Sequence, residues 1–224
     1  MVFFKFRKKP IVLTVHGFGQ KRHHEMDDLA AFLSRQGYEV IQFDLYDLNN
    51  PSDADIHKWI ERAEQAMKKA LSKSSEVYVV GFSMGGVISS YLATIYPIKA
   101  LVLVAPAFQY INLQLAKTIT MKTFSSTSPS ASKAPSKAQT KAFTEIVSRF
   151  KESIAHVTCP ILILHGTKDE VIDPSSSHSA FKKIDHPKKC LLYLEGAPHR
   201  LLYTKEFEKP AFSIILSMLQ GKLV

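Results

Sequence analysis

Cysteine is scarce in this chain of 224 residues, which contains two cysteines, Cys159 and Cys190. The first stands at the start of an expected strand and the second lies within another, and neither belongs to a spacing typical of metal ligands. Cysteines in such places are expected to be buried free thiols. The sequence therefore gives no sign of a cysteine metal site, and we expect no metal and no cofactor.

Long apolar runs are absent as well. No apolar run reaches the roughly 18 to 20 residues that a membrane-spanning helix needs. A basic stretch, residues 3–10, precedes the apolar run Ile11–Val15, but this run is shorter than the core of a signal peptide and no small-residue cleavage site follows it. We therefore expect a cytoplasmic protein with no stable membrane anchor.

Acidic residues are outnumbered, since 20 Asp and Glu face 29 Lys and Arg and leave a formal net charge of +9. Much of the excess lies between Lys117 and Lys151, where seven basic residues accompany one acidic residue. No nucleic-acid recognition motif accompanies this charge, so we expect no nucleic-acid partner. Two interpretations of the segment stay open: a solvated loop that keeps the protein soluble, or a basic surface that attracts an anionic substrate or an acidic lipid.

The rest of the sequence is typical of a globular α/β domain. Apolar residues make up 46% of the chain, and its length suits one domain with a full hydrophobic core. Apolar segments predict strands at residues 11–15, 39–43, 76–80, 99–104, 160–164 and 189–194, with residues 2–6 as a candidate edge strand. Because helical patterns alternate with these strands, the fold class is α/β, with three layers and a mostly parallel sheet.

Two features of this pattern carry more detailed expectations. The second helix is expected to have Ser52 as its N-cap, with Asp53 and Asp55 in its first turn. No strand signal occurs from residue 105 to about residue 158, and residues 122–142 are rich in Ser, Thr, Lys, Ala and Pro, which predicts a mobile surface excursion. We therefore expect a single domain over residues 1–224, with a small cap inserted at 105–158.

The strongest local signal is the sequence Gly81-Phe82-Ser83-Met84-Gly85, which stands between a predicted strand and a predicted helix. This context is typical of a nucleophile elbow, in which the serine occupies a strained turn and exposes its Oγ. Gly81 and Gly85 are expected where a Cβ would collide with a neighbouring strand or helix. The Met84 N–H, at the start of the helix, would then face an oxyanion.

A serine nucleophile needs a base, and the base needs an acid that orients it. Functional groups in a parallel sheet gather on the loops that follow the strands, so the acid is sought after residue 164 and the base after residue 194. Asp169, Glu170 and Asp173 are the candidate acids, and Asp169 is preferred because Asp173, before a proline, suits an N-cap. His199 follows the last predicted strand and is the expected base. His165 is expected to be structural, and His16 to shape its loop by hydrogen bonding.

These motifs resemble the α/β-hydrolase fold, in particular small bacterial carboxylesterases and monoacylglycerol lipases. The resemblance covers nearly the whole chain and rests on four segments: His-Gly-Phe-Gly at 16–19, Gly-Phe-Ser-Met-Gly-Gly at 81–86, Gly-x-x-Asp-x-x-Ile at 166–172 and Ala-Pro-His at 197–199. It implies a serine hydrolase that cleaves carboxylic esters through a Ser83, Asp169 and His199 triad and an acyl-enzyme. It also implies that Phe18 supplies the second oxyanion N–H, beside that of Met84.

The chain departs from this family pattern in ways that bear on its substrate. Ten residues precede the first central strand, too few for the usual N-terminal hairpin, so the sheet is expected to be short by a strand. A small cap favours short to medium acyl chains of small-molecule esters, with Phe108, Tyr110 and Ile111 as candidate pocket residues. A non-catalytic binding or scaffold protein on the same fold is the alternative, and acyl transfer or peptide cleavage is a further one.

Overall fold

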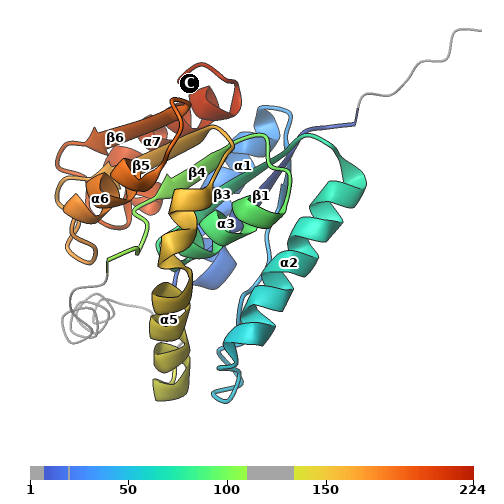
Figure 1. The fold of residues 1–224 in the computed structure, drawn as a ribbon, viewed down its shortest axis with the longest axis vertical. Helices are drawn as coiled ribbons and strands as arrows, with labels where there is room; N and C mark the ends of the chain where they lie inside the picture. Colours follow the sequence, from blue (N-terminus) through green and yellow to red (C-terminus); the bar gives the residue numbers. More distant parts are fainter. Residues whose placement is uncertain (1–7, 20, 110–133) are drawn as a thin grey trace, which may run out of the picture.

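Six parallel strands form the centre of the protein in a computed structural model, which describes residues 8–19, 21–109 and 134–224. Their order across the sheet is β2-β1-β3-β4-β5-β6, as Figure 1 shows. The strands are β1 (Ile11–Val15), β2 (Glu39–Ile41), β3 (Val77–Phe82), β4 (Leu101–Val104), β5 (Ile161–Gly166) and β6 (Lys189–Leu194). Each adjacent pair is parallel, which confirms the expected α/β class.

Helices cover both faces of this sheet. One face carries α1 (Asp27–Arg35) and α7 (Lys205–Leu219), which lie behind the sheet in Figure 1. The other face carries α2 (Ile56–Lys73), α3 (Met84–Ile95), α5 (Lys137–Phe150) and α6 (Ser175–Lys183). Three short 3₁₀ helices are η1 (Arg22–Met26), η2 (Lys151–His156) and η3 (Leu201–Tyr203).

The apolar strands separate two cores because successive side chains of a strand point to opposite faces. Leu13 of β1 belongs to the core that contains Trp59 of α2, whereas its neighbour Val12 belongs to the core that contains Leu29 of α1. All five residues of β1 are buried, as expected for a strand covered on both faces. The resulting three-layer arrangement is the one that the alternating sequence pattern predicts.

Parallel strands bring the predicted site residues to one edge of the sheet. His16 follows β1, Ser83 follows β3, and the loops after β5 and β6 carry Asp169 and His199. The strands run in the same direction, so the loops that follow them leave the sheet at its carboxyl edge. This topology accounts for the convergence of residues that are far apart in the sequence.

The expected Ser52 cap is wrong. Helix α2 begins at Ile56, and the side chain of Asp55 accepts a hydrogen bond from His57 N at 2.9 Å as its N-cap. Asp53 is instead buried in the preceding loop, where Oδ2 accepts from Asp47 N at 2.8 Å and lies 2.7 Å from Arg62 Nη1. The loop therefore uses Asp53 to satisfy its own backbone, which leaves Asp55 as the residue at the helix start.

The expected surface excursion at 122–142 is corrected in part, because residues 137–142 are the first turns of α5. A capping box begins this helix, in which the side chains of Ser136 and Gln139 bond to each other's backbone N–H groups. The buried Gln139 Nε2 also donates to Asp47 O at 2.9 Å. Contacts with a loop 92 residues away in the sequence, and not local propensity, place this helix. The division into one domain with a cap at 105–158 stays a prediction.

The N-terminal edge of the sheet matches the expectation of a shortened sheet. Within residues 8–19, 21–109 and 134–224, no strand precedes β1, and β2 lies at the end of the strand order. The candidate edge strand at residues 2–6 lies outside the described residues. In the same described ranges, no helix is both long enough and apolar enough to span a membrane.

Replacing Gly85 with alanine is expected to destabilise the fold strongly. A Cβ at Gly85 would collide with Val15 O and lie 2.6 Å from His16 O, and neither backbone atom can rotate away. We expect a loss of about 3 kcal/mol or more in the free energy of unfolding. Gly19→Ala is the matched control, because a Cβ there meets nothing within 4 Å, and should change the value by no more than about 0.5 kcal/mol. Urea denaturation measures both, and equal losses would contradict the collision argument.

Candidate active site

Ser83 occupies a strained backbone conformation between β3 and α3. Its φ of 53° and ψ of −117° lie in a region that residues other than glycine rarely adopt. Neighbouring backbone holds this conformation: Ser83 N donates to Val104 O at 3.0 Å, and Ser83 O accepts from Gly86 N at 3.0 Å and from Ala107 N at 3.1 Å. Such strain persists only where the surroundings enforce it, and it is concentrated at functional sites.

The glycines around Ser83 confirm the expected crowding. A Cβ at Gly81 would collide with the Ser89 side chain and lie 2.6 Å from Gly85 O. A Cβ at Gly86 would lie 2.9 Å from Pro106 Cβ. Helix α3 therefore packs directly against the end of β3, and this close contact requires the sharp turn on which Ser83 lies.

Asp169 and His199 are brought together by the loops after β5 and β6. Asp169 Oδ2 lies 2.7 Å from His199 Nδ1, and Asp169 Oδ1 accepts hydrogen bonds from Val171 N and Ile172 N at 2.8 Å each. Burial alone would raise the pKa of Asp169, but the hydrogen bonds from His165 and His199 hold it well below its ordinary value. Because the ionised carboxylate is an acceptor, it fixes the proton on His199 Nδ1 and leaves Nε2 of the neutral ring free to accept one.

The imidazole of His199 lies beside the serine turn. Its ring centroid is 5.0 Å from that of Phe82, the residue before Ser83, and its backbone N donates to Glu170 Oε2 at 3.0 Å. Within the described part of the chain, the Ser83 hydroxyl makes no hydrogen bond to His199. Such bonds between nucleophile and base are often long without substrate and shorten in the complex. The structure thus joins Asp169 to His199 directly, and joins His199 to the Ser83 turn through Phe82.

The alternative acid, Asp173, lies one residue before Pro174, the N-cap of α6, so the expectation that Asp173 is itself the N-cap is wrong by one residue. Its Oδ1 accepts a hydrogen bond from Ser175 N at 2.8 Å, at the start of α6. Hydrogen bonds from the side chain and then the backbone of Ser175 lower the pKa of Asp173, which lies at the surface. Among the described residues, the hydrogen bond and ion pair of His199 Nδ1 are made with Asp169 and not with Asp173. Its position therefore gives it no direct part in orienting that imidazole.

His165 is the residue whose connection to the site the sequence did not indicate. Its ring is fully buried, with Nε2 lying 2.9 Å from Asp169 Oδ2 and 3.2 Å from Ile172 O, while Nδ1 lies 2.6 Å from Ser177 Oγ. Both groups near Nε2 are acceptors, so Nε2 carries a proton and donates to the carboxylate. Asp169 Oδ2 is thus held between two imidazoles. The only available signal was the position of His165 at a strand end, four residues before the acid.

The loop after β1 is held by buried polar groups. His16 Nδ1 lies 2.7 Å from Gly17 O, and His16 Nε2 accepts from Leu45 N at 2.9 Å, so Nδ1 is the donor to the carbonyl. Burial lowers the pKa of His16 to about 4, which keeps this ring neutral at pH 7. The Tyr46 hydroxyl donates to Gly19 O and accepts from Gly19 N, at 2.8 Å each. The prediction that His16 shapes its loop is confirmed.

Two backbone donors at this edge have no protein acceptor among the residues that the structure describes. In the described ranges, no hydrogen bond is donated by Phe18 N, which lies between the bonded Gly17 and Gly19. Met84 N, at the first turn of α3, likewise has no acceptor there. Helix starts and free N–H groups favour negative charge. These are the two donors that the sequence assigns to an oxyanion.

An aromatic cluster fixes the position of Phe18. Its ring stacks on Phe143 of α5 with a centroid distance of 4.9 Å and an interplanar angle of 7°. It also contacts Tyr46 at 5.6 Å and Trp59 at 6.4 Å between centroids. Helix α5 lies in the segment expected to be a small cap. It therefore packs against the loop that carries the Phe18 N–H.

The predicted substrate pocket is described only in part. Phe108 is buried and lines a hollow of about 80 Å³ with Ile154 of η2 and Ala180 of α6, and neither Ser83 nor His199 lines that hollow. Tyr110 and Ile111 lie outside the described residues. The assignment of these three side chains to an acyl pocket stays a prediction.

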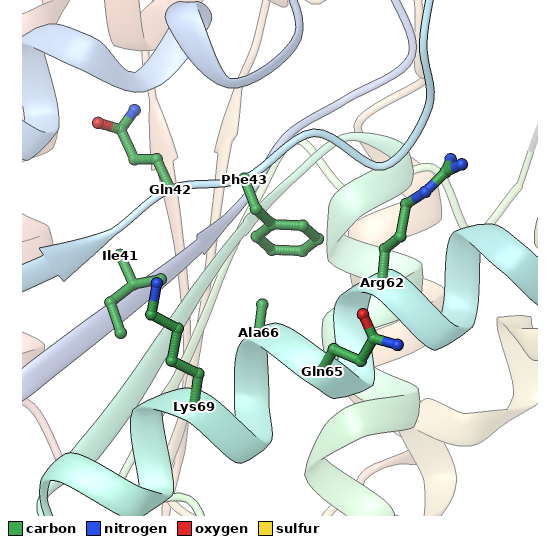
Figure 2. A pocket seen from close by; sticks show the side chains of 7 residues that line it. All are labelled: Ile41, Gln42, Phe43, Arg62, Gln65, Ala66 and Lys69. Atoms are coloured by element: carbon green, nitrogen blue, oxygen red, sulfur yellow. The ribbon is translucent and has the colours of Figure 1, made fainter.

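A second and larger hollow lies between β2 and α2, away from the predicted site residues. It measures about 280 Å³, and its lining is shown in Figure 2: Ile41, Gln42, Phe43, Arg62, Gln65, Ala66 and Lys69. The guanidinium of Arg62 is already bonded to Asp53 and to Leu45 O. No predicted site residue lines this hollow. The described residues also contain no cluster of three or more His, Cys, Asp or Glu side chains that could hold a metal ion.

Replacing His165 with alanine is expected to lower stability by about 2 to 4 kcal/mol, because it leaves a buried cavity and removes partners from Asp169 and Ser177. His165→Gln should recover part of this loss, since its amide can still donate near the position of Nε2. The exposed His57→Ala is the control and should change stability by no more than about 0.5 kcal/mol. Urea denaturation at pH 7 measures all three. If His165→Ala loses no more stability than His57→Ala, the buried contact between His165 and Asp169 contributes nothing to the free energy of unfolding.

Comparison with curated proteins finds relatives over most of the chain. It is 30% identical over 162 residues to alpha/beta hydrolase domain-containing protein 17C of Mus musculus, which covers 71% of this chain and 44% of that protein. It is also 30% identical over 150 residues to alpha/beta hydrolase domain-containing protein 17B of Homo sapiens, which covers 66% and 44% respectively. The chain thus spans less than half the length of these curated relatives.

Solved structures with the same fold include lipolytic enzymes. One, from work on LipS and LipT, two metagenome-derived lipolytic enzymes, is 20% identical, covers 96% of this chain and 95% of its own, and has a TM-score of 0.79. A soluble variant of monoglyceride lipase from Saccharomyces cerevisiae is 18% identical over 100% and 90% of the two chains, with a TM-score of 0.77. Residues 11–188, which include Ser83 and Asp169, match a family of proteins. The protein therefore has the α/β-hydrolase fold and belongs to the Uncharacterised protein family (UPF0227).

Proposed function

We propose that this protein is a serine hydrolase that cleaves carboxylic esters. The observation that carries the proposal is the hydrogen bond of 2.7 Å between Asp169 and His199, beside a serine with a φ of 53°. A buried, ionised carboxylate that orients an imidazole next to a strained serine is the arrangement that nucleophilic catalysis needs. The curated relatives named as hydrolase domain proteins and the lipases of the same fold support hydrolysis.

The proposed reaction begins with attack of Ser83 Oγ on the carbonyl carbon of the ester. His199 Nε2 takes the hydroxyl proton, and Asp169 stabilises the imidazolium through its bond to Nδ1. The carbonyl oxygen becomes an oxyanion, which the N–H groups of Phe18 and Met84 stabilise. Collapse of this intermediate breaks the bond to the alcohol, which leaves with the proton from His199.

The second half of the reaction regenerates the serine. Water attacks the acyl carbon and gives a proton to His199, the same N–H groups stabilise the second oxyanion, and the acid leaves as Ser83 recovers its proton. Asp169 keeps its orientation throughout because Val171 N, Ile172 N and His165 hold it independently of His199.

The proposed substrates are small-molecule esters with short to medium acyl chains, and the proposed location is the cytoplasm. A small cap at 105–158, with Phe108, Tyr110 and Ile111 lining the acyl site, is the proposed source of this preference. Helix α5 supports the view that part of this segment contacts the site, since its Phe143 stacks on Phe18.

Replacing Ser83 with alanine should abolish hydrolysis of p-nitrophenyl acetate, because the nucleophilic oxygen is removed. We expect kcat to fall to about one-thousandth of wild type or less, with urea denaturation showing a folded protein. A fluorophosphonate probe should label the wild-type protein and leave Ser83→Ala unlabelled. If neither the wild-type protein nor the variant reacts with the probe, the non-catalytic binding alternative is favoured instead.

Two carboxylate variants distinguish the candidate acids. Asp169→Asn should lower kcat by about four orders of magnitude, because the amide no longer fixes the proton on His199 Nδ1. Asp173→Asn should leave kcat close to wild type and cost less than about 1 kcal/mol of stability, since an amide oxygen can still accept the hydrogen bond from Ser175 N. Steady-state kinetics and urea denaturation measure the two effects. The opposite ranking of kcat would assign the acid role to Asp173.

A further inference from the structure

Glu25 is a buried carboxyl group that the proposed reaction does not use. It lies on η1, the 3₁₀ helix that follows the His16–Gly19 loop, and only 7% of its surface is exposed. Its Oε1 accepts a hydrogen bond from Gly17 N. Burying a carboxyl group costs free energy, and a role for Glu25 in holding this loop would explain why it is buried here.

The carboxyl group of Glu25 lies close to the nucleophile residue. A Cβ built on Gly17 would be 3.1 Å from Glu25 Oε1, 3.1 Å from Phe82 Cδ1 and 3.1 Å from Ser83 Cβ. These three atoms therefore surround the same side of the Gly17 Cα. A charge on Glu25 would therefore lie close to the Ser83 side chain.

Both the N–H and the C=O of Gly17 are hydrogen-bonded, and these two bonds determine the direction of the Phe18 N–H. Glu25 accepts from Gly17 N, and His16 Nδ1 donates to Gly17 O at 2.7 Å. In a planar trans peptide the C=O and the N–H of the next residue point in opposite directions. With the Gly17 carbonyl directed to His16, the Phe18 N–H is directed away from it, and it is the donor without a protein acceptor in the described ranges.

We propose that Glu25 is a positioning residue for the Phe18 N–H, that it works in its protonated, neutral form, and that its ionisation slows the reaction. The inference rests on the proposed serine hydrolase activity. In the neutral form the carboxyl still accepts the Gly17 N–H bond and adds no charge. In the ionised form a negative charge beside the forming oxyanion opposes its stabilisation.

The charged and titratable groups around Glu25 are consistent with a neutral carboxyl at pH 7. Burial raises the pKa of Glu25 to about 8, and the Gly17 N–H bond and the charges of Arg200 and Lys21 only partly oppose this rise. The other groups that face it are Tyr203 and Tyr46, and burial raises the pKa of both phenols so that they stay neutral. Lys21 is also directed to the Tyr203 ring, with Nζ 4.6 Å from its centroid.

The first test is the pH profile of kcat/KM for p-nitrophenyl acetate. In the wild-type protein the rate should fall about tenfold between pH 7 and pH 10 as Glu25 ionises. Glu25→Gln keeps an acceptor for Gly17 N but cannot ionise, so it should match wild type within about twofold at pH 7 and show no fall at high pH. Glu25→Ala lacks the acceptor and should lose about 10- to 100-fold in kcat at every pH, with little change in KM.

Glu61→Gln, on the exposed side of α2, is the control and should keep the wild-type profile. Stability gives a second readout that does not need activity. Between about pH 4.5 and pH 8 the folded state retains a proton on Glu25 that the unfolded state has lost, so stability falls as the pH rises. Over this window, the ratio of the wild-type unfolding constant to that of Glu25→Gln should rise about tenfold per pH unit, and level off above it.

An alkaline fall that persists in Glu25→Gln, or a pH-independent ratio of unfolding constants, would overturn the role of Glu25 while the hydrolase proposal stands. Wild-type kcat in Glu25→Ala would overturn it as well. If Glu25→Ala does not fold, the Glu25→Gln profile decides the question alone. A wild-type protein that neither hydrolyses the ester nor reacts with a fluorophosphonate would overturn the proposed function, and this inference with it.

Discussion

The strained backbone at Ser83 is the constraint on which the rest of the site depends. A φ of 53° in a residue with a Cβ persists because β3, β4 and α3 meet around it without room for side chains at Gly81, Gly85 and Gly86. The same close packing brings α3 against β1, so the Met84 N–H and the His16–Gly19 loop share one edge of the sheet. The local strain and the convergence of the loops thus have one cause, the tight contact of α3 with the strand ends.

Two buried carboxyl groups beside this turn have pKa values shifted in opposite directions. Asp169 accepts hydrogen bonds from two imidazoles and two backbone N–H groups, which together outweigh burial and keep it ionised. Glu25 accepts one backbone N–H bond, which does not outweigh burial. The number of donors around each group decides its charge. The pKa of the carboxyl group that bonds to His199 is therefore lowered, whereas the pKa of the carboxyl group that bonds to Gly17 is raised.

The region between β4 and β5 contains α5 and the residues proposed to line the substrate pocket. Helix α5 is anchored by Gln139 to a loop before α2, and its Phe143 stacks on Phe18. The helix thus supports the loop that carries one of the free N–H groups. The solved structures that share the fold at 18 to 20% identity bear on the architecture alone. In the described part of this region, α5 is thus in contact with both the loop before α2 and the loop after β1.

The sequence by itself determined the fold class, the strands that the candidate site residues follow, and the turn at Ser83 with its glycines. These features depend on short motifs and on the alternation of apolar segments. It also placed Asp169 and His199 after the right strands, where the structure joins them. Only the tertiary structure decided the rest. The N-cap is Asp55 because Asp53 bonds within the loop, Gln139 orders α5 through a residue 92 positions away, and His165 and Glu25 meet Asp169 and Gly17 only once the loops are folded. Such roles depend on burial and on partners distant in space, and no local pattern of residue types encodes them.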